Sequence, residues 1–267
     1  MSRLKTACST EENLIRATER ALGSVNPSKK STPFYLFTVS SLYREPWLSR
    51  DLLLKEAGEE TMLFGLLSSG PLFSQDGFYE KGLILGRIDS PELHLESVIL
   101  EGNGQKLEEK IQDAFFFLTQ RRNGSQMLLL AFADKGFGSH DSVVESLALC
   151  CRNHSIEGVG GFIDSSSLGA HSGIFYNSPT VGKALLLIGL YHRGGVSLGV
   201  TQDEPFKTEA SPEGSLILAS PSSLPPSCQC SLFPVHPYFS VATAGQFHLP
   251  KEGTPRQGLD LVVRVDF

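Results

Sequence analysis

The chain lacks any long apolar run. A membrane-spanning helix needs about 20 consecutive apolar residues, whereas the longest apolar run, Ala184 to Leu190, has the length of a buried strand and is interrupted by Gly189. The first residues also lack the apolar core of a secretory signal. We therefore expect an intracellular, cytoplasmic protein without a transmembrane segment. Met1 to Thr10 is basic, rich in Ser and Thr and free of acids, which leaves mitochondrial import as the alternative.

The chain also has fewer basic residues than acidic ones. The chain has 23 Lys and Arg against 29 Asp and Glu, a net charge of -6 and a pI near 5.7. A nucleic-acid-binding surface would need a basic patch, and the Lys and Arg residues are scattered, so nucleic acid is excluded as a partner. The hydrophobic content of 40% excludes a disordered chain. A length of 267 residues fits one large domain or two closely packed small ones.

Cysteines are few and do not follow the spacing of a disulfide scaffold. There are five of them, an odd number, and a reducing compartment keeps thiols free. Cys150 and Cys151 lie in an apolar helical stretch, which predicts a structural role. Cys228, Cys230 and His236 lack the second pair of ligands that a structural zinc site uses. We therefore predict no metal and no cofactor.

Helical and strand patterns alternate along most of the chain. Capping boxes at Ser9-x-x-Glu12 and Ser142-x-x-Glu145 predict the starts of two helices, and Pro46 and Gly58 bracket another. Short apolar runs predict buried strands between the helices. The predicted helices cover 12–22, 46–57, 107–118 and 142–151, and the predicted strands cover 34–39, 61–67, 82–88, 93–100, 127–133, 156–163, 184–191 and 196–201.

The order of these elements occurs twice. With an offset of 95 residues, Phe37 falls on Phe132 and Gly65 falls on Gly160. A constant offset over successive elements is typical of a duplication, although helix–strand alternation is generic in α/β proteins. The sequence thus predicts the α/β class, with two pseudo-repeated helix–strand–helix–strand units that form a β-sheet core flanked by helices. The expected divisions are a flexible N-terminus (1–11), a first unit (12–104), a second unit (105–205), and Pro/Ser-rich loops with strands (206–267) that complete the same domain, its last strand (259–267) closing the same sheet.

No known catalytic motif is present, but polar residues gather after the predicted strands. In α/β sheets the loops at the carboxyl ends of the strands form the ligand crevice, and small hydroxyls, glycines and acids there suit an amine or an amino acid. The alternative is that these residues simply form turns and caps. A Ser69, His171 and Asp164 set would instead suit a hydrolase. The candidate ligand-binding residues are Ser68, Ser69, Asp134, Gly160, Gly161, Asp164 and Ser165.

The run from Met127 to Ser167 resembles the FIST domain (F-box and intracellular signal transduction). The family pattern is an apolar strand, a small-residue loop, a helix, and a strand that ends in Gly-Gly and then an acid. Gly160, Gly161 and Asp164 occupy these places. The resemblance extends over roughly residues 12 to 205. It implies an intracellular sensory domain that binds small ligands such as amino acids or related metabolites. In some members an F-box precedes the domain; because the first predicted helix begins by residue 12, we expect none here.

We therefore expect a non-enzymatic sensing module with a small-molecule ligand and, in addition, a protein partner. The first alternative is a protein-interaction scaffold or a ubiquitin-pathway adaptor without its own F-box. The second alternative is a small hydrolase with a Ser or Cys nucleophile.

Overall fold

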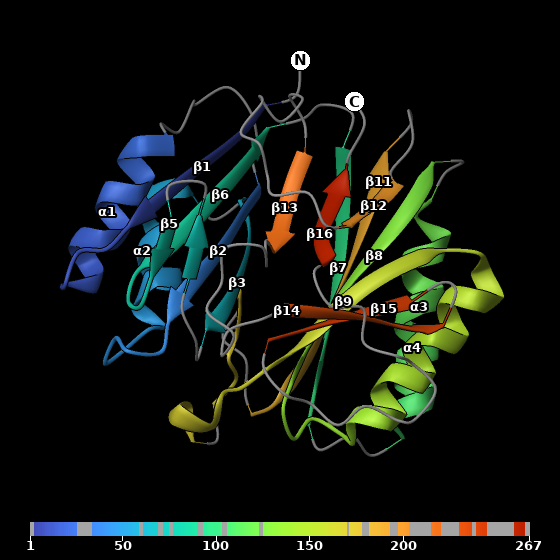
Figure 1. Ribbon diagram of the computed structural model, residues 1–267. Helices are drawn as coiled ribbons and strands as arrows, with labels where there is room; N and C mark the ends of the chain where they lie inside the picture. The colour runs from blue at the N-terminus through green and yellow to red at the C-terminus, as the bar shows by residue number, and fades with distance from the viewer. Residues whose placement is uncertain are drawn as a thin grey trace. The chain divides into compact units, whose positions relative to one another are not determined.

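The computed structural model divides by its internal contacts into two compact units. Unit 1 comprises Met1–Pro91 and Ile163–Gly182, and unit 2 comprises Glu92–Phe162 and Lys183–Phe267. Each unit has a mixed sheet with two helices, which confirms the predicted α/β class (Figure 1). The structure describes residues 3–25, 34–58, 61–68, 72–74, 77–89, 93–102, 106–122, 125–169, 171–177, 182–192, 197–202, 215–219, 230–236, 239–244 and 259–264.

Unit 1 is built on a five-stranded sheet with the order β1-β6-β2-β3-β10. Only β2 and β3 are parallel; their neighbours run antiparallel to them. Helix α1 contacts β1, β6 and α2, and both helices cover one face of this sheet (Figure 1). A short hairpin of β4 and β5 precedes β6. The bounds are β1 (Arg3–Ser9), α1 (Leu14–Val25), β2 (Phe34–Ser40), α2 (Leu48–Ala57), β3 (Met62–Ser68), β4 (Leu72–Ser74), β5 (Gly77–Tyr79), β6 (Leu83–Asp89) and β10 (Ile174–Tyr176).

Gly65 explains how the apolar strands of unit 1 fit together. Phe37 on β2 and Phe175 on β10 are the register partners of Gly65 on its two sides. Their buried rings stack with centroids 5.7 Å apart. A Cβ on Gly65 would lie 2.1 Å from the Phe37 ring, so only glycine leaves room for the ring at this position.

Unit 2 is built on a six-stranded sheet with the order β14-β15-β9-β8-β11-β7. Helices α3 and α4 pack against each other, and α3 contacts β7 and β11. A second sheet of three strands has the order β12-β16-β13. The bounds are β7 (Leu93–Glu101), α3 (Leu107–Gln120), β8 (Gln126–Asp134), α4 (His140–His154), β9 (Glu157–Ile163), β11 (Ala184–His192), β12 (Ser197–Gln202), β13 (Ser215–Ala219), β14 (Cys230–His236), β15 (Phe239–Ala244) and β16 (Leu259–Arg264).

The two units share one chain order and one strand order. Unit 1 runs β1-α1-β2-α2-β3 and later β6, and unit 2 runs β7-α3-β8-α4-β9 and later β11. In the sheets these strands stand as β1-β6-β2-β3 and β7-β11-β8-β9. This agreement is what a duplication would produce, but the duplication itself stays a prediction. Strand β7 pairs with β11 and so lies in unit 2 rather than with the elements that precede it in the chain.

Both predicted capping boxes are wrong. Ser9 belongs to β1, a strand that the sequence did not predict, and α1 is capped by Asn13, whose Oδ1 accepts from the backbone N–H groups of Ile15 (2.9 Å) and Arg16 (3.2 Å). The cap of α4 is Ser139, whose Oγ accepts from Ser142 N–H at 3.2 Å. In each case the acceptor is the side chain of the residue directly before the first helical residue.

Two other expectations also differ from the structure. The apolar residues Leu14, Ile15 and Leu22 predict one inner face for α1, but Ile15 is 44% exposed. The C-terminal strand was expected to close the main sheet, but β16 pairs with β12 and β13. Strands β14 and β15 extend the main sheet instead, through a parallel pairing of β15 with β9.

Candidate functional site

The predicted Ser68 lies beside a second serine, Ser40, at one edge of the unit 1 sheet. Because β2 and β3 are parallel, their carboxyl ends share this edge, and Ser40 is the register partner of Ser68. The Ser41 N–H donates to the Ser68 carbonyl at 2.8 Å, which joins the start of the loop after β2 to the end of β3. Ser69 lies outside the described residues. We refer to this edge as the serine rim.

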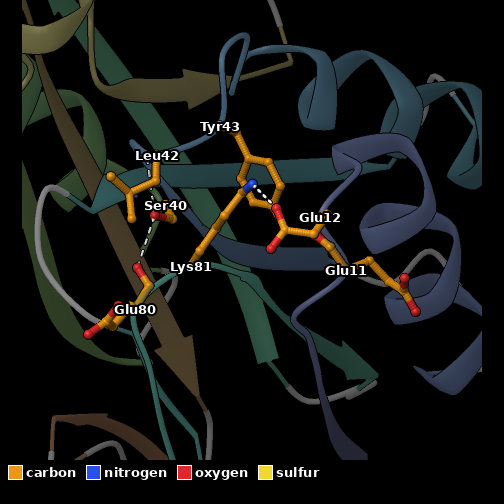
Figure 2. Close-up of polar contacts among 7 residues, drawn as sticks. All are labelled: Glu11, Glu12, Ser40, Leu42, Tyr43, Glu80 and Lys81. Carbon is orange, nitrogen blue, oxygen red and sulfur yellow. Dashed lines mark hydrogen bonds and ion pairs between the residues drawn. The ribbon is translucent and has the colours of Figure 1, made fainter.

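The loop after β2 is held in place by a tyrosine (Figure 2). The Tyr43 hydroxyl donates to the Glu11 carbonyl at 2.6 Å. The Lys81 ammonium lies 4.9 Å from the centre of the Tyr43 ring and pairs with the Glu12 carboxylate at 2.7 Å. Burial, followed by the charge of Glu12, raises the pKa of Tyr43 to about 12, so the hydroxyl remains a donor at neutral pH.

Ser40 fixes the other end of the same loop. Its buried hydroxyl accepts from the Leu42 N–H at 3.2 Å and donates to the Glu80 carbonyl at 3.4 Å (Figure 2). Between these anchors Leu42 projects into solvent. Trp47, the single tryptophan of the chain, is also exposed and occupies the N-cap of α2, where its side chain makes no capping hydrogen bond. The loop therefore presents apolar side chains at the rim from a fixed backbone.

A segment from the middle of the chain completes the rim beside β3. Residues 163–182 belong to unit 1, and β10 pairs with β3. The Leu67 N–H donates to the Gly173 carbonyl at 2.7 Å. A Cβ on Gly173 would lie 2.7 Å from Ile163 Cγ2, 3.0 Å from Ser165 Cβ and 3.2 Å from Leu67 Cβ. Ser165 and the adjacent Asp164 therefore lie close to the end of β3.

Asn177 attaches the far end of this segment. Its side-chain Oδ1 accepts from the Leu63 N–H at 2.8 Å, and its Nδ2 donates to the Thr61 carbonyl. The amide thus replaces a strand neighbour at the start of β3, so backbone groups on that side of the strand are hydrogen-bonded without a longer β10.

Asp164 has a local role that is visible in the structure. Its Oδ1 accepts from the Ser166 N–H at 3.1 Å and caps the turn that leads into the short 3-10 helix η1 (Ser166–Leu168). The carboxylate is half-buried, and Ser165 beside it is fully buried. Further along, His171 is exposed and its ring lies 6.3 Å from the Trp47 ring, centre to centre, with a 34° tilt.

The remaining candidate residues lie in unit 2. Asp134, at the end of β8, is 1% exposed and its Oδ2 accepts from the Ala184 N–H at 3.0 Å, which fixes the start of β11. Gly160 packs against β8, because a Cβ there would lie 2.2 Å from the Ala131 carbonyl oxygen. These contacts explain both residues by packing. Any part that they take in ligand binding stays a prediction.

Gly161 borders a small apolar gap in unit 2. The gap has room for about one water molecule. The His140 ring stacks on Phe162, which also borders the gap, with centroids 3.5 Å apart. Burial, followed by the charge of Lys135, lowers the pKa of His140. The gap is lined by Ala131, Ala133, Val143, Val144, Leu147, Gly160, Gly161, Phe162 and Leu185, and so does not include Asp164.

Cys150 and Cys151 have the surroundings of structural thiols. Both are buried in the core between α3, α4 and the sheet of unit 2. Burial raises the pKa of Cys150 to about 11 and that of Cys151 further still. A cysteine nucleophile needs a lowered pKa and access to solvent, so these two residues do not support the hydrolase alternative.

Two further observations concern membrane-spanning helices and metal sites. Within the described part of the chain, no helix combines the length and apolarity that crossing a bilayer requires. Nor do three His, Cys, Asp or Glu side chains gather there in a way that would hold a metal ion.

Comparison with known families identifies one match. The model of the FIST N domain matches residues 34–208, which agrees with the resemblance found in the sequence and extends over both units. A comparison with proteins of curated function finds no match.

Proposed function

Because the chain belongs to the FIST N domain family, whose model matches residues 34–208 of 267, we propose that it is a sensing module that binds a small amine or amino acid at the serine rim of unit 1. The family supports a sensor-like role in signal transduction. One observation supports the location: the segment that carries Asp164 and Ser165 packs against the end of β3, beside Ser68. The segment with the acid thus lies next to the strand end that carries the serine.

The chemistry of the rim favours a ligand with an ammonium group. The half-buried Asp164 carries a negative charge at the rim, and its Oδ1 accepts from the Ser166 N–H. An ammonium would add a charge-assisted hydrogen bond, which contributes more than a neutral one. Trp47 offers an aromatic face for the apolar part of such a ligand.

The substitution Asp164→Asn separates the two roles of this residue. The asparagine oxygen can still accept from the Ser166 N–H, so the turn and the stability should be kept. The negative charge is lost, and affinity for an amine should fall by about 1.5–3 kcal/mol, or roughly ten- to a hundredfold. Asp141→Asn is the matched control, because Asp141 is an exposed acid at the first turn of α4 in unit 2.

The assay begins with a thermal-shift screen of the standard amino acids and simple alkylamines. Compounds that stabilise the protein are then titrated by calorimetry into the wild type, Asp164→Asn and Asp141→Asn. Fluorescence of the single tryptophan, Trp47, reports independently whether binding occurs at the rim. Equal affinities of wild type and Asp164→Asn would refute the ligand role and leave Asp164 as a turn cap.

A protein-interaction scaffold is the second candidate, and one observation favours it. Helix α3 exposes two adjacent phenylalanines, Phe116 and Phe117. Exposed aromatic side chains of this size are common in protein–protein interfaces.

A further inference from the structure

The outer face of α3 carries two phenylalanines among its polar and charged residues. Its inner face buries Ile111, Phe115 and Leu118 among other residues. On the opposite side Phe116 is 58% exposed and Phe117 is 39% exposed. A helix that covers a sheet normally places charged and polar residues on its solvent side. The two rings are therefore not explained by the packing of unit 2.

Charged residues of opposite sign flank these rings. Asp113 and Arg121 are both exposed. Residues 113, 117 and 121 follow one another at intervals of four and therefore lie along one side of the helix. The Arg121 guanidinium already lies 5.1 Å from the centre of the Phe117 ring. We call Asp113, Phe116, Phe117 and Arg121 the α3 stripe. From its N-terminal to its C-terminal end the stripe runs acid, aromatic, base.

The charges of the stripe are complementary to those of a second, antiparallel copy of the same stripe. If two copies of α3 pack antiparallel about a two-fold axis near Phe117, Asp113 of each copy meets Arg121 of the other, and the aromatic rings meet between them. A two-fold interface requires such self-complementarity, because the same patch serves both subunits. We propose that the α3 stripe is a homodimer interface and that its occupant is a second copy of this chain.

The size of the stripe sets the expected strength. A helix of 14 residues is about 21 Å long, so one helix face buries less than the ~800 Å² per partner of a standard stable interface. The dimer should therefore be weak and depend on protein concentration. It should also weaken with added salt, because the two ion pairs lie at an exposed rim.

Charge reversal tests the antiparallel geometry directly. Asp113→Arg and Arg121→Asp should each bring like charges together twice per dimer and weaken self-association about tenfold or more. An equimolar mixture of the two variants should dimerise again, because each copy then supplies the charge that the other needs. The double variant, with both changes in one chain, should also regain dimerisation. The measurement is sedimentation equilibrium over a concentration series of the full chain.

Two further variants complete the design. Phe117→Ser should abolish dimerisation, whereas Leu149→Ser removes an exposed apolar side chain of α4 that is not part of the stripe and should leave it unchanged. All the substituted side chains are exposed, and circular dichroism checks that each variant folds. A wild type that stays monomeric at its highest soluble concentration would overturn the proposal. So would single reversals that leave the dimer intact, or a mixture that fails to restore it.

Discussion

Gly160 allows the sharpest test of how the sheet of unit 2 is packed. A Cβ at this position would lie 2.2 Å from the Ala131 carbonyl oxygen and 3.1 Å from the Ala131 carbonyl carbon. Both atoms belong to the backbone of β8, so no side-chain rotation can make room. For Gly160→Ala to fold, β8 and β9 must separate locally, which strains the core and weakens hydrogen bonds between them.

The magnitude follows from these two costs. Overpacking a core by one methyl group costs about 1–3 kcal/mol, and each weakened backbone hydrogen bond adds about 1 kcal/mol. We expect Gly160→Ala to lose about 3 kcal/mol of unfolding free energy. At roughly 2–4 °C per kcal/mol for a chain of this size, Tm should fall by about 6–12 °C.

Gly23→Ala is the matched control. Gly23 lies in α1, is exposed, and has no atom within 4 Å of the added Cβ. The same chemical change should therefore stabilise the protein by about 0.5–1 kcal/mol, because alanine is a better helix former. Urea and thermal unfolding followed by circular dichroism measure both variants. A Gly160→Ala protein as stable as the wild type would refute the packing argument. If that variant also lost ligand binding, the glycine would serve the ligand instead.

Two further predictions concern titratable groups. Burial raises the pKa of Cys150 from 9.0 to about 11, so about one part in a thousand of this thiol is thiolate at pH 8. Thiol-specific labelling of Cys150 in the native protein should therefore be roughly a hundredfold slower than labelling of an ordinary thiol. Rapid labelling before unfolding would contradict its structural role. Burial lowers the pKa of His140 from the ordinary 6.5. At a pH under about 6.5 the unfolded chain therefore binds more protons than the folded protein, and the free energy of unfolding falls as the pH falls. His140→Gln should reduce the loss of Tm between about pH 7.5 and about pH 5.5, and an unchanged loss would show that other groups dominate.

The sequence predicts best those elements whose periodicity is strong. Helix α3 was expected over 107–118 and spans Leu107–Gln120. Its apolar residues at helical spacing are all buried, namely Leu107, Ile111, Ala114, Phe115 and Leu118. The apolar strands at 127–133 and 184–191 also appear within one residue of their predicted ends. Such strands can be recognised from the sequence alone, because a strand that is buried on both faces of a sheet must be apolar along its whole length.

Elements that depend on distant partners could not be predicted in this way. The alternating sequence of β1 is stabilised by its antiparallel pairing with β6, about 80 residues away. Three-residue β10 carries too little pattern to recognise, yet its attachment to β3 brings Asp164 to the serine rim. The sequence identified Asp164 as a strand-end acid, but it gave no indication that Asp164 would lie near Ser68 rather than near Asp134.

Trp47 shows that local sequence rules also fail to predict some exposed residues. It occupies a helix N-cap, where Ser, Asp or Asn would contribute a capping hydrogen bond. Local propensity gives no reason to expect a tryptophan there, and only the fold shows that it stands beside His171. Positions where local rules fail are those where function is most often found.

The return of residues 163–182 to unit 1 determines how the chain can be divided. A fragment that ends near residue 91 would keep the first five-stranded sheet except for β10, and would lose both hydrogen bonds from Asn177 to the start of β3. The outer edge of β3 would then expose unpaired backbone groups and the apolar ring of Phe37, a combination that favours aggregation. Neither unit can therefore be isolated by a single cut. A working half of this protein would need residues 163–182 joined to the first unit by a new linker.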